Sequence, residues 1–292
     1  MMLLSAIFFA ANCLIIRWVG LFANMDGWTT SFTRGVAGSF FVLCFYSRGR
    51  GLQLTHLRKP LLLLRGALGV TTISLLYFTI IHLGAARALV INLTYPLFGT
   101  LIASLALREK FQIRTMIFLV VALLGLVLFF LESFLGSTFG KYDLLGLFGA
   151  LLSGATVVTI RKLAQTETAA TIYSSQCFIT LLVTTPFAAS SFNQISPPTW
   201  GLMLLAGLIV AYGQILITKG FYHLDVARGS ALQMLVPIIT SAGAFLLFDE
   251  KFTFIELIGA SLTLFATWRI SINPSSSQTP NNPKHKIPQD SK

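Results

Sequence analysis

The chain has 292 residues, of which 55% are hydrophobic and only 11% are charged. This leaves too little polar surface to cover a soluble globule of this size, so lipid is the expected solvent. The net charge of +11 would suit nucleic acid, but the basic residues form no continuous face or recognition motif. We therefore interpret them as determinants of membrane topology and expect no nucleic-acid partner.

Ten apolar segments predict transmembrane helices, because about 20 residues are needed to cross a hydrocarbon core of about 30 Å. The chain begins in the first of them, without the features of a cleaved signal peptide. The gaps are too short for a second domain, and residues 272–292 are predicted to form a disordered tail. In chain order the segments cover residues 2–18, 28–46, 60–81, 86–107, 113–131, 144–161, 169–188, 199–218, 226–248 and 254–270.

Basic residues favour one side of the predicted membrane. With the N-terminus inside, fifteen Lys and Arg residues fall in the cytoplasmic gaps and tail, whereas the opposite side receives only Arg87, Lys141 and Lys251. By the positive-inside rule, this distribution predicts ten spans with both termini in the cytoplasm.

The chain also repeats itself at an offset of 141 residues. The matches include His82 with His223, Arg87 with Arg228, Pro96 with Pro237, and Glu109-Lys110-Phe111 with Glu250-Lys251-Phe252. We predict one five-span repeat over residues 1–131 and a second over 132–271. Because five is odd, the second repeat enters the membrane from the opposite side. Inverted repeats are typical of secondary transporters, which expose one midplane site to each side in turn.

The two repeated prolines lie within predicted spans. Pro96 and Pro237 lack the N–H that would bond the carbonyls of Asn92 and Gln233, which also carry amide side chains. Broken backbone at this depth is tolerated where it lines a cavity, and it can serve as a hinge. The alternative is that each proline only kinks its helix and the amides bridge helices.

Several of these residues carry a family resemblance over the chain up to about Ile270. They are the block from Leu83 to Ala88 with Tyr95-Pro96 and Glu109-Lys110, its echo from Leu224 to Arg228 with Pro237 and Glu250-Lys251, and Arg34 in the second span. The chain resembles EamA-type permeases of the drug/metabolite transporter superfamily. The resemblance implies an all-α metabolite carrier of a bacterial inner (plasma) membrane. Its central cavity would be lined by spans one, three, four, six, eight and nine.

Arg34 is the principal candidate for substrate binding. A charge within a span is costly enough to suggest a function, and a guanidinium can bind a carboxylate or phosphate through two hydrogen bonds. The alternative is that Arg34 reaches the membrane surface or bonds helix carbonyls. At an offset of 142 residues the second repeat has Gln176 in its place.

Polar side chains within other spans complete the candidate set. Each of them can instead serve as a contact between helices. The full set of substrate-binding candidates is Arg34, Tyr77, Asn92, Tyr95, Tyr173, Gln176, Tyr212, Gln214 and Gln233. The candidate gates are Glu109, Lys110, Glu250 and Lys251, whose alternative role is to interact with helix dipoles.

The expected function is secondary transport of a small polar metabolite, such as an amino acid or S-adenosylmethionine, across the lipid bilayer. All ten acidic residues fall at span ends, in gaps or in the tail, which favours exchange or facilitated transport over proton coupling. Cys13, Cys44 and Cys177 have no metal-ligand spacing, so we expect no metal or cofactor. An intramembrane enzyme would need clustered catalytic groups that the sequence lacks. A scaffold or sensor is the other alternative, and the chain can be a monomer or a homodimer.

Overall fold

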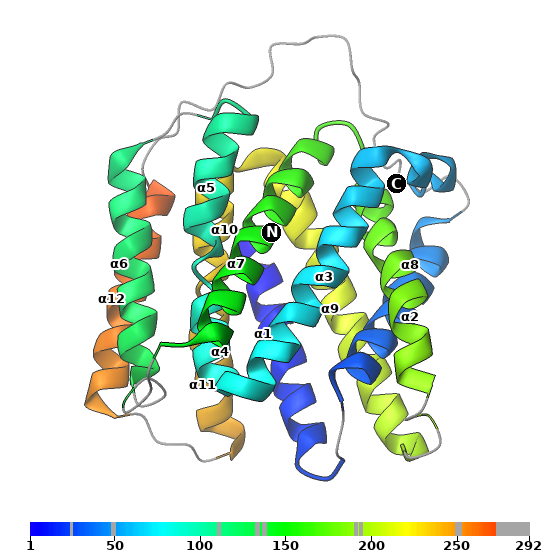
Figure 1. Cartoon of the computed structure of the whole chain (residues 1–292), viewed down its shortest axis with the longest axis horizontal. Coiled ribbons are helices and arrows are strands. Elements are labelled where there is room, and N and C mark those ends of the chain that lie inside the picture. Colours follow the sequence, from blue (N-terminus) through cyan, green and yellow to red (C-terminus); the bar gives the residue numbers. More distant parts are fainter. Residues whose placement is uncertain are drawn as a thin grey trace.

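The computed structural model describes residues 1–23, 26–47, 51–109, 112–131, 135, 139–189, 192, 195–248 and 253–272. Long helices lie side by side across the bundle in Figure 1. In chain order they are α1 (Met2–Gly20), α2 (Gly27–Tyr46), a short 3₁₀ helix (Leu54–Arg58), α3 (Pro60–Leu83), α4 (Ala85–Asn92), α5 (Tyr95–Ala106), α6 (Ile113–Phe129), α7 (Lys141–Leu163), α8 (Ala169–Ala188), α9 (Pro197–His223), α10 (Val226–Gln233), α11 (Val236–Phe248) and α12 (Phe254–Ile272). Three predicted features lie outside the described residues: Lys110, the pair Glu250 and Lys251, and the tail beyond residue 272.

Within the described residues, seven stretches are long and apolar enough to cross a membrane. They are α1, α3, Arg87–Ala106, α7, α9, Val226–Leu247 and α12. The other three predicted spans correspond to α2, α6 and α8. Helix α6 has 17 residues, whereas α2 and α8 carry many Ser and Thr residues. The protein is a multi-pass, all-α integral membrane protein, and the count of ten spans stays a prediction.

The outer surface is apolar, as lipid requires. Leu105, Leu182, Leu246 and Ile81 are each at least 75% exposed, and in water such a surface would favour aggregation. The polar helices α2 and α8 pack against each other at the right-hand edge of the bundle in Figure 1. Several of their buried hydroxyls bond backbone carbonyls of their own helix, as Thr33 does with Thr29 and Thr30. This local bonding satisfies those hydroxyl groups without water.

The two repeats are visible in the helix boundaries. Both ends of α10 lie 141 residues after the corresponding ends of α4, and α11 and α12 begin 141 residues after α5 and α6. The packing is also symmetric, since α1 packs on α9 as α3 packs on α7, and α2 packs on α9 as α3 packs on α8. Corresponding helices run in opposite directions in Figure 1, where α3 descends and α9 ascends. The fold therefore consists of two inverted repeats related by an approximate two-fold axis.

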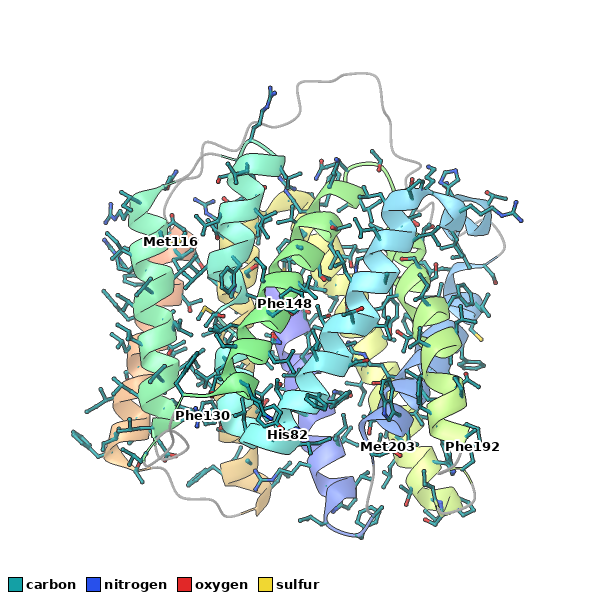
Figure 2. All side chains as sticks on the ribbon, in the orientation of Figure 1. His82, Met116, Phe130, Phe148, Phe192 and Met203 are labelled. Atoms are coloured by element: carbon teal, nitrogen blue, oxygen red, sulfur yellow. The ribbon has the colours of Figure 1, made fainter. Side chains whose placement is uncertain are left out.

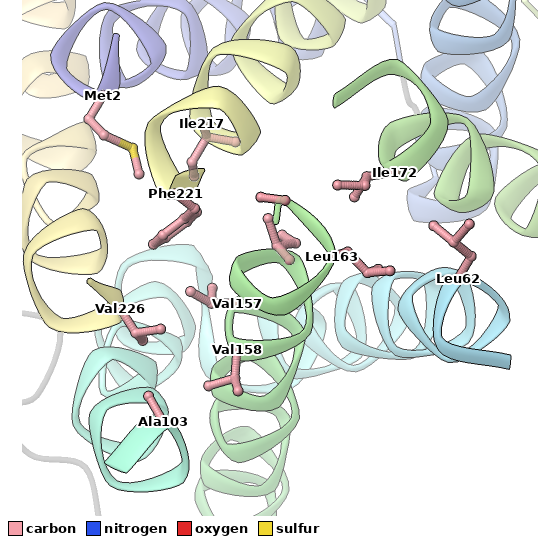
Figure 3. Close-up of a cluster of buried hydrophobic side chains, with 12 residues drawn as sticks. Met2, Leu62, Ala103, Val157, Val158, Leu163, Ile172, Ile217, Phe221 and Val226 are labelled. Carbon is pink, nitrogen blue, oxygen red and sulfur yellow. The ribbon is translucent and has the colours of Figure 1, made fainter. Parts of the chain in front are cut away.

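Buried apolar side chains around the last turns of α7 join the repeats. Figure 3 shows Val157, Val158 and Leu163 of α7 among side chains from other helices. Phe221 of α9 is fully buried beside Met2 of α1. The contact between Met2 and α9 is close, because a Cβ on Gly220 would lie 2.7 Å from the Met2 side chain. This cluster fixes α7 and α9 relative to α1.

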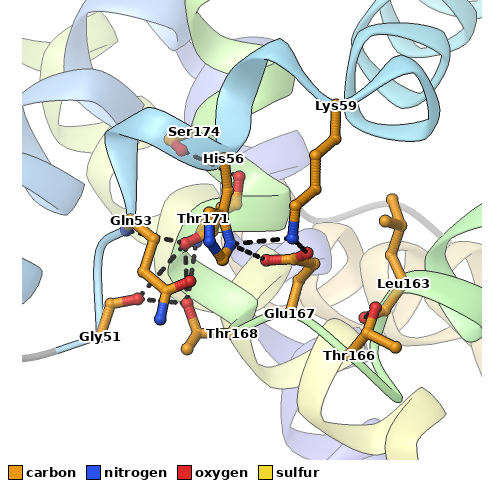
Figure 4. Close-up of polar contacts among 10 residues, drawn as sticks. All are labelled: Gly51, Gln53, His56, Lys59, Leu163, Thr166, Glu167, Thr168, Thr171 and Ser174. Atoms are coloured by element: carbon orange, nitrogen blue, oxygen red, sulfur yellow. Dashed lines mark hydrogen bonds and ion pairs between the residues drawn. The ribbon is translucent and has the colours of Figure 1, made fainter.

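A polar network ties two connecting segments together outside the membrane (Figure 4). The Glu167 carboxylate accepts a hydrogen bond from Lys59 Nζ at 2.5 Å and contacts His56 Nδ1 at 2.8 Å. Thr168 and Thr171 both donate to the Gly51 carbonyl. The segment before α3 is thus fastened to the segment before α8.

Glu167→Gln should destabilise the protein at neutral pH. Burial by itself raises the pKa of Glu167, but the hydrogen bonds from Lys59 and His56 outweigh burial and lower its pKa overall. Their stabilising contribution is present above the pKa of the unfolded chain and is lost as pH falls through the folded pKa. We expect a loss of about 1–2 kcal/mol at pH 7, limited by the exposure of Lys59. Thermal unfolding in detergent should show a lower unfolding temperature for the variant than for wild type at pH 7, and this difference should shrink at pH 4. An equal difference at both pH values would contradict this role of Glu167.

Candidate functional site

Arg34 lies on α2 between two small cavities inside the bundle. The first has a volume of about 10 Å³ and is lined by Arg34, Ser31, Gly35, Ile73, Tyr173, Gln176, Cys177 and Thr180. The second has a volume of about 30 Å³ and is lined by Arg34, Asn12, Ile16, Thr30, Thr33, Tyr77, Met203, Ala206 and Gly207. Figure 2 shows Met203 in the lower part of the bundle. Arg34 thus faces cavities formed by both repeats.

The structure brings Arg34 together with Tyr77, Tyr173 and Gln176 of the candidate set. Tyr173 and Gln176 share the first cavity with Arg34, and Tyr77 shares the second. The Tyr173 hydroxyl is buried and has no hydrogen-bond partner among the described residues. Within the same part of the chain, no carboxylate pairs with Arg34. A cation and an unsatisfied hydroxyl next to a cavity can both bind a ligand oxygen.

Arg65 on α3 was not among the predicted candidates, but it contacts Gln176, which lines the first cavity. Only 2% of Arg65 is exposed, and its Nη2 donates to Gln176 Oε1 at 2.7 Å. Its Nε and Nη1 are buried without partners among the described residues. The sequence did carry a signal, because Arg65 lies inside a predicted span just as Arg34 does. The corresponding residue of the second repeat is Ala206.

Five other candidates lie away from these two cavities. The Asn92 side-chain oxygen accepts from Ser153 on α7 at 3.3 Å, and Gln233 donates to the Met2 carbonyl at 3.3 Å. Tyr95 packs against the α7 cluster. Tyr212 is 39% exposed and its ring contacts Phe8 and Phe41, and Gln214 is half-buried on the same helix. The first two contacts match the alternative in which interior amides join helices.

Both prolines follow a break between two helices. Helix α4 ends at Asn92 and α5 begins at Tyr95, and likewise α10 ends at Gln233 and α11 begins at Val236. Pro96 lies in the first turn of α5, where the missing N–H costs little. The two cavities around Arg34 are lined by α1, α2, α3, α8 and α9, so the breaks in spans four and nine line neither of them. This differs from the lining that the family resemblance implies.

Glu109 connects three helices at the upper end of the bundle in Figure 1, where α5, α7 and α9 end. Its carboxylate accepts from Arg161 Nε at 3.2 Å and from the Val226 amide at 3.1 Å. Arg161 Nη1 also donates to the carbonyls of Phe221 and Tyr222, at 2.6 and 2.7 Å. Burial raises the pKa of Glu109, although the Val226 amide and Arg161 act in the opposite direction. The contact holds the ends of α5, α7 and α9 against the start of α10.

A second ion pair lies at the opposite end of α7. Arg87 in the first turn of α4 donates through Nε to Asp143 Oδ1 at 2.8 Å, and both side chains are buried. Asp143 also accepts from the Gly140 amide and so caps α7. Nearby, the His82 ring stacks on Tyr142 with 4.0 Å between ring centroids (Figure 2). Helix α7 is therefore held by charged contacts at both ends.

Comparisons with known proteins agree with this architecture. The model of the EamA-like transporter family matches residues 1–131 and 140–272, one match in each repeat. The pseudopaline exporter CntI of Pseudomonas aeruginosa is 27% identical over 82% of this chain and 84% of its own length. Human solute carrier family 35 member G1 is 28% identical over 74% of this chain and 63% of its own length.

One solved crystal structure has the same fold. It superimposes with a TM-score of 0.75 at 15% sequence identity, covering 93% of this chain and 95% of that one. The named relatives are transporters rather than enzymes, and the family model matches both repeats. The chain is a membrane transporter and belongs to the EamA-like transporter family.

Proposed function

We propose that the protein carries a small polar metabolite across the membrane by alternating access and that Arg34 binds it. The observation that carries this proposal is the position of Arg34, which faces two cavities between helices of both repeats. A charge inside a membrane protein is costly, and a solute with a carboxylate or phosphate group would compensate it. The described acidic side chains with buried contacts pair elsewhere, Asp143 with Arg87 and Glu109 with Arg161. This pairing favours exchange or facilitated transport.

The symmetric packing supports the alternating mechanism. When two inverted repeats have similar but unequal contacts, an exchange of those conformations moves the opening from one side of the membrane to the other. The contacts are unequal here, because α9 packs closely on α1 through Met2, whereas the position 141 residues after Met2 is Asp143, which binds Arg87 instead. The contact at the start of α1 is therefore apolar, whereas the corresponding contact at the start of α7 is an ion pair. Two gates that are controlled separately require such a difference.

The two cavities are too small to hold a metabolite in this conformation, because their volumes of about 10 and 30 Å³ are far below the roughly 300–1,000 Å³ of ligand pockets for drug-sized compounds. The site must therefore open before a solute reaches Arg34, as alternating access requires. Amino acids, S-adenosylmethionine and similar metabolites are the proposed class. One relative is named as an exporter, and we propose the same direction for this chain.

Transport can be tested in proteoliposomes that contain the purified protein. Vesicles would be loaded with pooled amino acids, nucleosides, S-adenosylmethionine and sugar phosphates, and counterflow of each labelled compound would be measured. We expect saturable counterflow of at least one compound, which empty liposomes lack. If no compound accumulates above empty liposomes, while the same preparation is folded by thermal unfolding, the proposed function is wrong.

Glu109→Gln should open the upper end of the bundle. The variant keeps the shape of the side chain but removes the charge that Arg161 binds, as protonation would. Cys177 lines the first cavity, so its modification by a membrane-impermeant thiol reagent reports access when Cys13 and Cys44 are replaced by Ser. We expect labelling from the Glu109 side to be several-fold faster than in the parent.

Glu256→Gln is the matched control, because Glu256 accepts a hydrogen bond from the Thr253 amide at the start of α12, away from this contact. Labelling of this control should equal that of the parent. Equal labelling rates in the Glu109 variant, its control and the parent would remove Glu109 from the gate.

A further inference from the structure

Arg65 presents a buried charge that the described chain does not neutralise. Its side chain is 2% exposed, and its hydrogen bond goes to the neutral Oε1 of Gln176. Two of its three guanidinium nitrogens have no partner in the part of the chain that the structure describes. A buried guanidinium without a counter-charge is strongly destabilising. This cost suggests that something outside the chain supplies the missing negative charge.

Gln176 links Arg65 to Arg34. Its side chain lines the first cavity together with Arg34 while its oxygen holds Arg65. The space is tight on the Arg65 side, where a Cβ on Gly69 would lie 2.6 Å from Arg65 Nη1 and 3.1 Å from Gln176. The charges of Arg34 and Arg65 are close enough to act on each other. Arg34 lines the first cavity directly, and Arg65 lies next to it in contact with the lining residue Gln176.

Both cations come from the first repeat. The residue that corresponds to Arg34 is Gln176, and the residue that corresponds to Arg65 is Ala206. Because α2 packs on α9 as α8 packs on α3, the fold places Arg34 near Ala206 and Gln176 near Arg65. The two repeats thus have similar backbones, but only the first repeat carries the two charged side chains.

We propose that Arg34 and Arg65 together bind a solute with at least two negative charges on oxyanion groups such as carboxylate or phosphate. This inference rests on the proposed function and specifies its substrate class. A dianion neutralises both guanidinium groups, whereas a monoanion leaves one charge unbalanced. One oxyanion binds Arg34, and the other replaces the Gln176 oxygen at Arg65. The Tyr173 hydroxyl then donates to the bound oxyanion.

Binding can be measured without transport, on the full chain in detergent. The probes are succinate, malate, inorganic phosphate and glycerol phosphate, with acetate and glycine as singly charged and zwitterionic controls, all at one ionic strength set with NaCl. We expect dianions to raise the unfolding temperature by several degrees and the controls to leave it near that of NaCl alone. Comparison of the carboxylate and phosphate arms identifies the preferred group. Equal shifts for dianions and controls would overturn the proposal.

Two variants test the residues themselves. Arg65→Gln should weaken dianion binding by about tenfold or more, whereas Arg58→Gln, which alters an exposed arginine, should leave it unchanged. Gln176→Glu places a carboxylate of the same shape beside Arg65, so it should raise the unfolding temperature of the ligand-free protein and abolish the dianion preference. If Gln176→Glu keeps full dianion affinity, Arg65 does not bind the solute. If dianions bind but no solute is transported, the proposed transport function is wrong and the dianion site stands. If neutral solutes are transported but dianions do not bind, the dianion site is wrong and the transport function stands.

Discussion

Arg34→Gln should reduce kcat/KM for the transported solute by about 10- to 100-fold. A hydrogen-bonded charge pair contributes about 1.5–3 kcal/mol, and each 1.4 kcal/mol corresponds to a factor of ten. The loss should be largest for solutes with a carboxylate or phosphate, because Gln can donate a hydrogen bond but cannot compensate charge. Initial counterflow rates over a range of solute concentrations would measure it. Arg34→Lys should recover only part of the activity, since an ammonium lacks the planar fork of the guanidinium.

Arg114→Gln is the matched control for this experiment. Arg114 is exposed in the first turn of α6 and lies over the Phe118 ring. Its removal should leave counterflow unchanged at equal amounts of reconstituted protein. If Arg34→Gln transports as well as this control does, Arg34 is a packing residue and the centre of the proposed site must be sought elsewhere.

Gly259→Ala should destabilise the protein by about 1–3 kcal/mol, because it forces apart two helices whose backbones touch. A Cβ at Gly259 would lie 2.5 Å from the Phe129 nitrogen and 2.6 Å from the Gly125 oxygen, and neither backbone atom can rotate away. The same contact includes the bond from the Thr263 hydroxyl to the Ala122 carbonyl at 3.2 Å. Close approach of this kind is typical of small residues in membrane helices. Gly259→Leu should prevent folding.

Gly201→Ala provides the control for Gly259→Ala. Gly201 also lies in a helix, α9, but a Cβ there would meet no atom within 4 Å. Because Ala favours helix over Gly by up to about 1 kcal/mol, this variant should be neutral or slightly more stable. Thermal unfolding followed by tryptophan fluorescence compares the two. Equal unfolding temperatures for Gly259→Ala and wild type would show that α6 and α12 separate without cost.

Much of the fold could be predicted from the sequence, because a bilayer imposes the same length and apolarity on every span. The offset of 141 residues predicted the two inverted repeats, and the helix boundaries follow it from α4 to α6 and from α10 to α12. The membrane transporter class and the family also follow from these patterns, and the comparisons confirm them. The missing N–H groups of Pro96 and Pro237 predicted the two places where spans four and nine divide into separate helices.

The candidate site was predicted only in part. Arg34 stood out because a charge within a span is rare, and the same rule applied equally to Arg65. We singled out Asn92 and Gln233 for their place beside the prolines, but the structure joins one to α7 and the other to Met2. The pairing of Arg65 with Gln176 crosses 111 residues of chain. No local pattern encodes such a contact.

The sequence by itself determined that this chain is a membrane protein, which residues form its helices, and that its two halves are inverted repeats. Only the tertiary structure decided which helix faces meet and which side chains share a cavity. The physical reason is that lipid and the protein interior are both apolar, so hydropathy does not distinguish a helix face that contacts lipid from one that contacts another helix. Close packing makes that choice, as at Gly259 against Phe129 and at Gly69 against Arg65.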